Sequence, residues 1–285
     1  MRNTILLLIA VASIINLNAI AQNKTNQTNV LASKPKVEDK TDQFNKHMNV
    51  ALMSYKEVKD LVKFAIDNYN DKQLWHLAYE LMTSKYYEFE PIIIKARIEH
   101  AKTPSDKAGM RCNYLQSAFL VKWRKRKYNK NGDMQISQKL KNEIYDAIDN
   151  FPSDCREQNN LNHFSGAVSC SMAIASRQEN DIDRAWDIYK TAKAKIPPPP
   201  YINDTDTVIT PMSNLDGGIR NLAVYLRKNI NRKNKKVSQK TVQEIIKAIE
   251  KMPDNAMGGK PAHLEHLNFF KKYEKEVAGT SLNNK

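Results

Sequence analysis

Three histidines that recur in similar short phrases are the residues in this sequence best suited to chemistry. They are His76 in "LWHL", His163 in "LNHF" and His266 in "LEHL". Imidazole groups gathered on one face could bind a metal ion or respond to pH near neutrality. No carboxylate spacing supports them as ligands, and "HLEH" (263–266) is not the HExxH pattern of zinc proteases. We therefore expect each histidine to pack locally, keep a histidine row as the alternative, and predict neither a metal nor a cofactor.

Other catalytic signatures are missing from the sequence. We find no nucleophile elbow and no glycine-rich phosphate loop. The glycines of "LDGGIR" (215–220) are a weak anion-binding candidate, since a helix cap with a turn explains them equally well. We assign no catalytic residue and favour a protein that is not an enzyme. A helical hydrolase of envelope polymers, using one of the three histidines, is the alternative.

Two clusters of basic residues are the candidate binding sites. The chain has 45 lysines and arginines against 31 acidic residues, and the formal net charge of +14 favours anionic partners. Each cluster ends a predicted helix, where cations also suit the helix dipole. An aromatic residue beside them could stack on bases or sugars. The clusters comprise Lys122, Trp123, Arg124, Arg126 and Lys127, and then Arg227, Lys228, Arg232 and Lys233.

The three cysteines could supply one disulfide. A pair tends to close in an oxidising compartment, and Cys155 with Cys170 would join a loop to the following helix. The sequence does not fix the connectivity, so three buried free thiols, including Cys112, are the alternative. No CxxC or Cys/His ligand spacing indicates a zinc site.

The first residues indicate an exported protein. Arg2 precedes the apolar run "ILLLIAVASII" (5–15), and Ala19 and Ala21 form a small-x-small cleavage signature. We predict a signal peptide over 1–21 and a flexible polar tether over 22–45. An uncleaved anchor is the alternative, but the run is short for a bilayer span. The mature chain should have no stable membrane span and lie in the periplasm or outside the cell, and the Asn, Lys and Ile bias favours a bacterial source.

Apolar residues three and four positions apart predict helices throughout the chain. Ser54 and Glu57 form a capping-box pattern, and Ser137 is a predicted helix cap. Pro91 marks the start of a new predicted segment, "IIIKARIEHA" (92–101). We expect loops at 103–109 and after "IPPPPY" (196–201), which no helix can cross.

These signals divide the chain after the tether into three parts. A helical repeat region is predicted over 46–196 and a Pro-rich irregular linker over 197–217. A C-terminal helical unit is predicted over 218–285.

One residue frame recurs in order along the chain. It consists of a first position that is mostly apolar, three residues, an apolar position, two residues, an alanine, four residues and a helix breaker. Matching order at matching spacing indicates internal repetition. The copies are Val58, Val62, Ala65 and Asn70; Leu140, Ile144, Ala147 and Pro152; and Thr241, Ile245, Ala248 and Pro253.

A fourth copy of the frame resembles a known helical repeat. Ala185, Tyr189, Ala192 and Pro197 have the same spacing, and this segment resembles the second helix of a tetratricopeptide repeat. The helix before it (163–177) offers Met172 and Ala173 at matching positions, although serines stand where that family usually has aromatics. The resemblance covers residues 163–197 best. It implies an all-α fold in which antiparallel helix pairs stack as a short solenoid, usually a surface for proteins or peptides.

The sequence thus predicts an exported helical-repeat protein that acts by binding. The expected partner is an envelope or extracellular protein or peptide. The alternative partner is an anionic polymer, namely a lipid head group, a polysaccharide or a nucleic acid, held by the basic helix ends.

Overall fold

A computed structural model of the chain describes residues 49–125, 135–202, 210–229 and 235–282. The predicted signal peptide and tether lie outside these ranges. Every regular element in them is a helix, accompanied by two isolated β-bridges. None of the described helices combines the length and the apolar character that crossing a bilayer requires.

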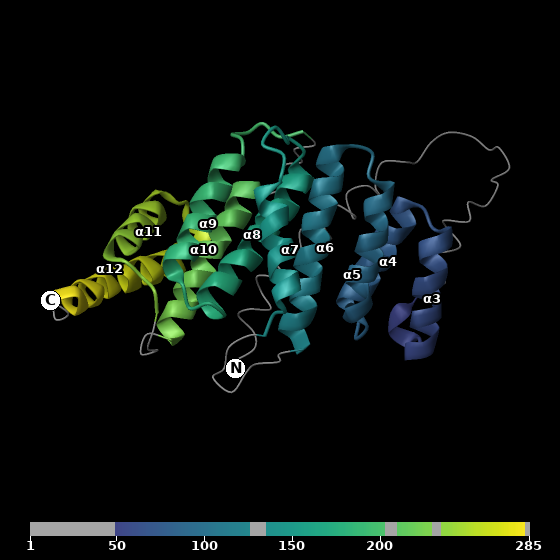
Figure 1. The fold of residues 1–285 in the computed structure, drawn as a ribbon, viewed down its shortest axis with the longest axis horizontal. Coiled ribbons are helices and arrows are strands. Elements are labelled where there is room, and N and C mark those ends of the chain that lie inside the picture. Colours follow the sequence, from purple (N-terminus) through teal and green to yellow (C-terminus); the bar gives the residue numbers. More distant parts are fainter. Residues whose placement is uncertain (1–48, 126–134, 203–209, 230–234, 283–285) are drawn as a thin grey trace.

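Ten α-helices follow one another along the described chain (Figure 1). They are α3 (Tyr55–Asn68), α4 (Asp71–Thr83), α5 (Glu90–Arg97), α6 (Pro104–Lys125), α7 (Gln138–Asp149), α8 (Gln158–Arg177), α9 (Ile182–Lys195), α10 (Pro211–Lys228), α11 (Gln239–Lys251) and α12 (Lys260–Leu282). Short 3-10 helices lie at η1 (Val50–Leu52), η2 (Tyr87–Phe89), η3 (Ile98–His100) and η4 (Asp254–Met257).

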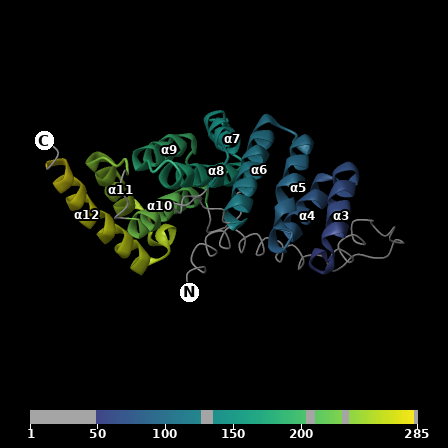
Figure 2. The ribbon, with the colours of Figure 1, turned by 60° about the horizontal axis from the view of Figure 1, so that its bottom comes forward.

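The helices form an elongated stack with two layers over much of its length. Helix α8 packs extensively against both α6 and α10, which gives one layer. Figure 2 shows α7, α9 and α11 on the other side of these helices. Helices α4 to α12 each pack against a neighbour in sequence and α3 packs on α5, so an all-α architecture with sequential helix packing is confirmed.

Local capping signals explain where several helices begin. The Ser54 amide donates to the Glu57 carboxylate over 2.6 Å, and the Glu57 amide donates to the Ser54 hydroxyl over 3.3 Å, so the predicted capping box is present. Ser137 caps α7 through the Leu140 amide, also as predicted.

Two predicted loops are partly helical. Helix α6 begins at Pro104, where the Thr103 hydroxyl accepts from the Asp106 amide, so most of 103–109 is helix. Helix α10 begins at Pro211 behind a capping box at Thr210, so the predicted linker 197–217 ends seven residues too late. Proline is well suited to the first turn of a helix because its missing N–H needs no partner there.

The buried side chains form two cores that meet between α5 and α6. One core holds residues from Val50 to Ile94, and the other runs from Cys112 to Tyr273. The helices after the Pro-rich segment therefore share a core with α6–α9. Tyr114 on α6 is partly buried against both cores.

The repeated frame corresponds to buried helix faces. Its copies lie on α3, α7, α9 and α11. At the alanine position of the frame, Ala65, Ala147 and Ala192 are at most 5% exposed, whereas Ala248 of α11 is half-buried. Small residues there let neighbouring helices approach closely. The "LWHL", "LNHF" and "LEHL" phrases lie on the following helices, α4, α8 and α12.

Candidate functional site

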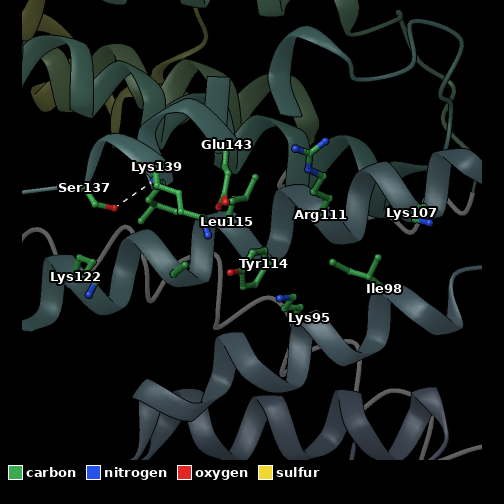
Figure 3. Close-up of a pocket in the computed structure, with 12 residues that line it drawn as sticks. Lys95, Ile98, Lys107, Arg111, Tyr114, Leu115, Lys122, Ser137, Lys139 and Glu143 are labelled. Carbon is green, nitrogen blue, oxygen red and sulfur yellow. Dashed lines mark hydrogen bonds between the residues drawn. The ribbon is translucent and has the colours of Figure 1, made fainter. Parts of the chain in front are cut away.

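A groove with a basic rim runs along α6 between α5 and α7, and we call it the basic groove. Its volume is about 490 Å³, within the range of small-ligand pockets. The side chains that line it come from all three helices and their ends (Figure 3). They are Lys95, Ile98, Lys107, Arg111, Tyr114, Leu115, Ala118, Lys122, Ser137, Lys139, Leu140 and Glu143.

Helix α6 supplies the floor of the basic groove. Its lining residues from Lys107 to Lys122 recur every three or four positions, which places them on one face of the helix. These two lysines mark opposite ends of the groove in Figure 3 and are separated by roughly 22 Å of helix. The groove is therefore long enough to receive several residues of an extended peptide.

The charges of the basic groove are strongly unbalanced. Lys95, Lys107, Lys122 and Lys139 are exposed, and none forms a salt bridge with another described residue. Arg111 is partly compensated, because its guanidinium lies 2.6 Å from the carboxylate of Asp146. Glu143 is the sole acidic residue among the lining side chains. Uncompensated cations around a concave surface attract anionic groups.

Apolar side chains lie between these cations. Leu115 and Leu140 reach the groove from the core and are only 1% and 8% exposed. Ile98, Tyr114 and Ala118 are half-buried. The groove can therefore accept an apolar side chain as well as a carboxylate.

The first predicted basic cluster is only partly available for binding. Lys122 lines the basic groove. Trp123 packs on Phe119, with ring centroids 6.0 Å apart, while Arg124 donates to the Met82 carbonyl over 3.0 Å and lies over the Tyr87 ring. Arg126 and Lys127 lie outside the described residues.

The described members of the second predicted cluster lie at the end of α10. Arg227 pairs with Glu265 on α12, and Lys228 is exposed. Arg232 and Lys233 lie outside the described residues. The guanidinium of Arg177, at the end of α8, lies over the rings of both Trp123 and Tyr225. The ends of α6 and α10 that carry the two clusters therefore lie on either side of α8.

The three histidines do not form a row. His76 lies on α4, His163 on α8 and His266 on α12, and these helices are separated in the stack by α5 and α6 and then by α10 (Figure 1). The recurring phrases fall on every second helix pair, so equivalent positions are two pairs apart. Across the described chain, no three His, Cys, Asp or Glu side chains gather as metal ligands.

Two of these histidines favour the neutral form. Burial lowers the pKa of His163 to about 4, with a further contribution from the charge of Arg97. Burial also lowers the pKa of His266, which is 3% exposed and whose Nδ1 has no hydrogen-bond partner among the described atoms. His266 is therefore buried in the protein, and His163 is half-buried on α8.

The predicted Cys155–Cys170 disulfide is not formed in the structure. Cys112, Cys155 and Cys170 are buried as free thiols. Burial raises the pKa of Cys112 and of Cys155 to about 12, so neither is a ready nucleophile.

Two acidic side chains away from the basic groove are shielded from water, Asp216 fully and Glu90 in part. Asp216 on α10 is 5% exposed and accepts a hydrogen bond from the Tyr189 hydroxyl over 2.8 Å. Burial raises the pKa of Asp216 and raises that of Glu90, at the start of α5, to about 7. These groups make stability depend on pH, and neither is among the side chains that line the basic groove.

Comparison with family models, with curated proteins and with solved structures gave no match to this chain. What the protein does must therefore be inferred from the groove and the sequence.

Sequence reasoning identified only one cation of the basic groove, Lys122. Lys107 and Arg111 lie on the same α6 face as Lys122, and that spacing is a usable signal. The spacing is interrupted in the prediction because Lys107 falls in the expected loop 103–109, whereas in the structure it lies in α6. Lys95 and Lys139 join them only through the packing of α5 and α7.

Proposed function

We propose that this protein binds an acidic, partly apolar segment of a partner protein in the basic groove. The observation that carries the proposal is the combination of four exposed lysines, without salt bridges to other described residues, around a floor that contains Leu115 and Leu140. Carboxylates of the partner would replace water around the lysines, and an apolar side chain would contact the floor. A groove that held only a polyanion would gain nothing from this floor.

The proposed scaffold is a short solenoid of tetratricopeptide-like helix pairs. Three buried alanines of the repeated frame, Ala65, Ala147 and Ala192, and the two layers support this assignment. In such a stack each pair contacts mainly its neighbours, which leaves long grooves between helices for a ligand. The signal-like segment 1–21 supports binding outside the cytoplasm, to an envelope or extracellular protein.

The test uses mature protein and a labelled peptide that contains several glutamates and one leucine, followed by fluorescence anisotropy. The groove variant carries Lys107→Gln, Lys122→Gln and Lys139→Gln. The matched control carries Lys56→Gln, Lys59→Gln and Lys63→Gln on α3, which removes the same charge at exposed positions away from the groove. We expect the groove variant to bind roughly tenfold more weakly, from three exposed ionic contacts, and the control to bind nearly as wild type.

Two outcomes contradict the proposal. Equal loss in the groove and control variants would show that net charge alone attracts the peptide. A polyphosphate that binds as tightly as the peptide, with no loss when leucine is removed from the peptide, would instead assign the groove to an anionic polymer. In that case affinity would fall steeply with salt.

A further inference from the structure

A second groove lies on the other flank of α7, between α7 and α9. Its volume is about 200 Å³, and its lining includes Tyr145, Ile148 and Asp149 from α7. The basic groove is lined by Lys139, Leu140 and Glu143 of the same helix. Helix α7 is therefore a wall shared by two grooves, with its first half lining one and its second half lining the other.

The lining of the second groove has more acidic than basic side chains, namely Asp149 and Asp187 against Arg184. Asp149 is exposed and its carboxylate forms no salt bridge with any described residue. Asp187 also lines this groove and pairs with Lys190 over 3.0 Å. The one cation of the lining, Arg184, is engaged by Glu179 over 3.0 Å and lies over the Tyr145 ring. The carboxylate of Asp149 is thus left to receive a cation.

The two ends of the α7 dipole match the charges that the two grooves favour. Its amino end, with Ser137 and Lys139, faces the basic groove, and its carboxyl end, with Asp149, faces the second groove. An amino end favours anions and a carboxyl end favours cations. The Lys195 ammonium already binds the carbonyls of Ile148 and Asp149 over 2.8 and 2.6 Å. The Asp149 side chain remains for a cation from outside.

We infer that the partner segment is bipolar and crosses α7, with its acidic part in the basic groove and a lysine or arginine at Asp149. This inference rests on the proposed function and adds the polarity and spacing of the ligand. The path from Lys139 and Glu143 over the helix to Asp149 is about 15 Å, from helix rise and diameter. An extended chain covers that distance in about five residues.

The experiment compares two peptides on two proteins. One peptide has a glutamate cluster, a spacer of about five residues and then an arginine. The other has glutamine in place of that arginine. Binding is measured to the wild type and to Asp149→Asn, with Asp67→Asn, at an exposed aspartate of α3, as the matched control. This is a double-mutant cycle between the arginine and Asp149.

We expect the arginine to tighten binding about threefold on the wild type and on Asp67→Asn, and to have no effect on Asp149→Asn. An arginine effect of the same size on all three proteins, or on none, would overturn the bipolar inference while leaving the proposed function intact. Failure of both peptides to bind the wild type would remove the proposed function and the inference with it.

Discussion

The guanidinium of Arg177 lies 4.7 Å from the centre of the Trp123 ring. The same guanidinium lies 5.3 Å from the centre of the Tyr225 ring. The three residues come from the ends of α8, α6 and α10, so one side chain connects three helices of the same layer. The stacking also explains why Trp123, a predicted ligand-binding residue, is occupied by an internal contact.

Replacing Arg177 should weaken the connection between these helix ends. We expect Arg177→Ala to lower the free energy of unfolding by about 1–2 kcal/mol, since two partly buried cation–π contacts are lost. Urea denaturation of Arg177→Ala, Trp123→Leu and the double variant measures the coupling between the two side chains. Strictly additive losses would show that the contact is incidental.

Ala147 tests the packing assigned to the repeated frame. Its side chain is 5% exposed on the core face of α7, so Ala147→Glu would bury a carboxylate without a partner. We expect the variant to be unfolded, or to lose more than about 3 kcal/mol of stability. The control is Asn142→Glu, at an exposed position of the same helix. A normal thermal transition for Ala147→Glu would contradict the role of the frame in packing.

Glu90 should make stability depend on pH near neutrality. Burial raises its folded-state pKa from 4.5 to about 7, so the folded protein holds the Glu90 proton more tightly than the unfolded chain does. The contribution of this tighter proton binding to the stability of the folded protein is complete below pH 4.5 and is lost as the pH rises to about 7. We expect Glu90→Gln to be nearly neutral at about pH 4 and to stabilise the protein by roughly 2–3 kcal/mol at about pH 8.

Chemical denaturation of wild type and Glu90→Gln at both pH values checks this prediction. Glu99→Gln, at an exposed position near the end of the same helical segment, is the control. The same difference between wild type and Glu90→Gln at both pH values would contradict a buried, protonated carboxyl group.

The Tyr189–Asp216 pair should contribute to stability through the hydroxyl. Both residues are nearly fully buried, and Tyr189→Phe would remove the donor 2.8 Å from the carboxylate. We expect a loss of about 1–3 kcal/mol, because a buried acceptor is left unpaired. The double variant Tyr189→Phe with Asp216→Leu should recover part of that loss in thermal unfolding. No recovery would mean that the carboxylate is stabilised by other groups.

Sequence reasoning was most successful where the signal is local. The Ser54 and Ser137 caps, the helix with Pro91 in its first turn and the burial of three of the four frame alanines depend on residues within one or two turns, and the structure contains them. Pro104 and Pro211 were expected in loops, but each begins a helix. Proline is common both in loops and in the first turn of a helix, so its presence alone does not distinguish the two.

The candidate site was harder to predict because it is assembled between helices. Lys95 and Lys139 are 44 positions apart and line one groove only because α5 and α7 both flank α6. The histidines show the reverse case. Similar phrases suggested a shared surface. The phrases lie on α4, α8 and α12, however, and the helix pair between successive copies keeps the imidazoles apart.

The position of Tyr114 has a mechanical consequence. The basic groove crosses the boundary between the two cores, with its α5 wall anchored in one core and its α7 wall anchored in the other. A segment bound in the groove would therefore touch side chains anchored in both cores, with Tyr114 between them. It would add contacts across the boundary at which the two cores meet, so occupancy of the groove would hold the first helices of the chain more firmly to the rest.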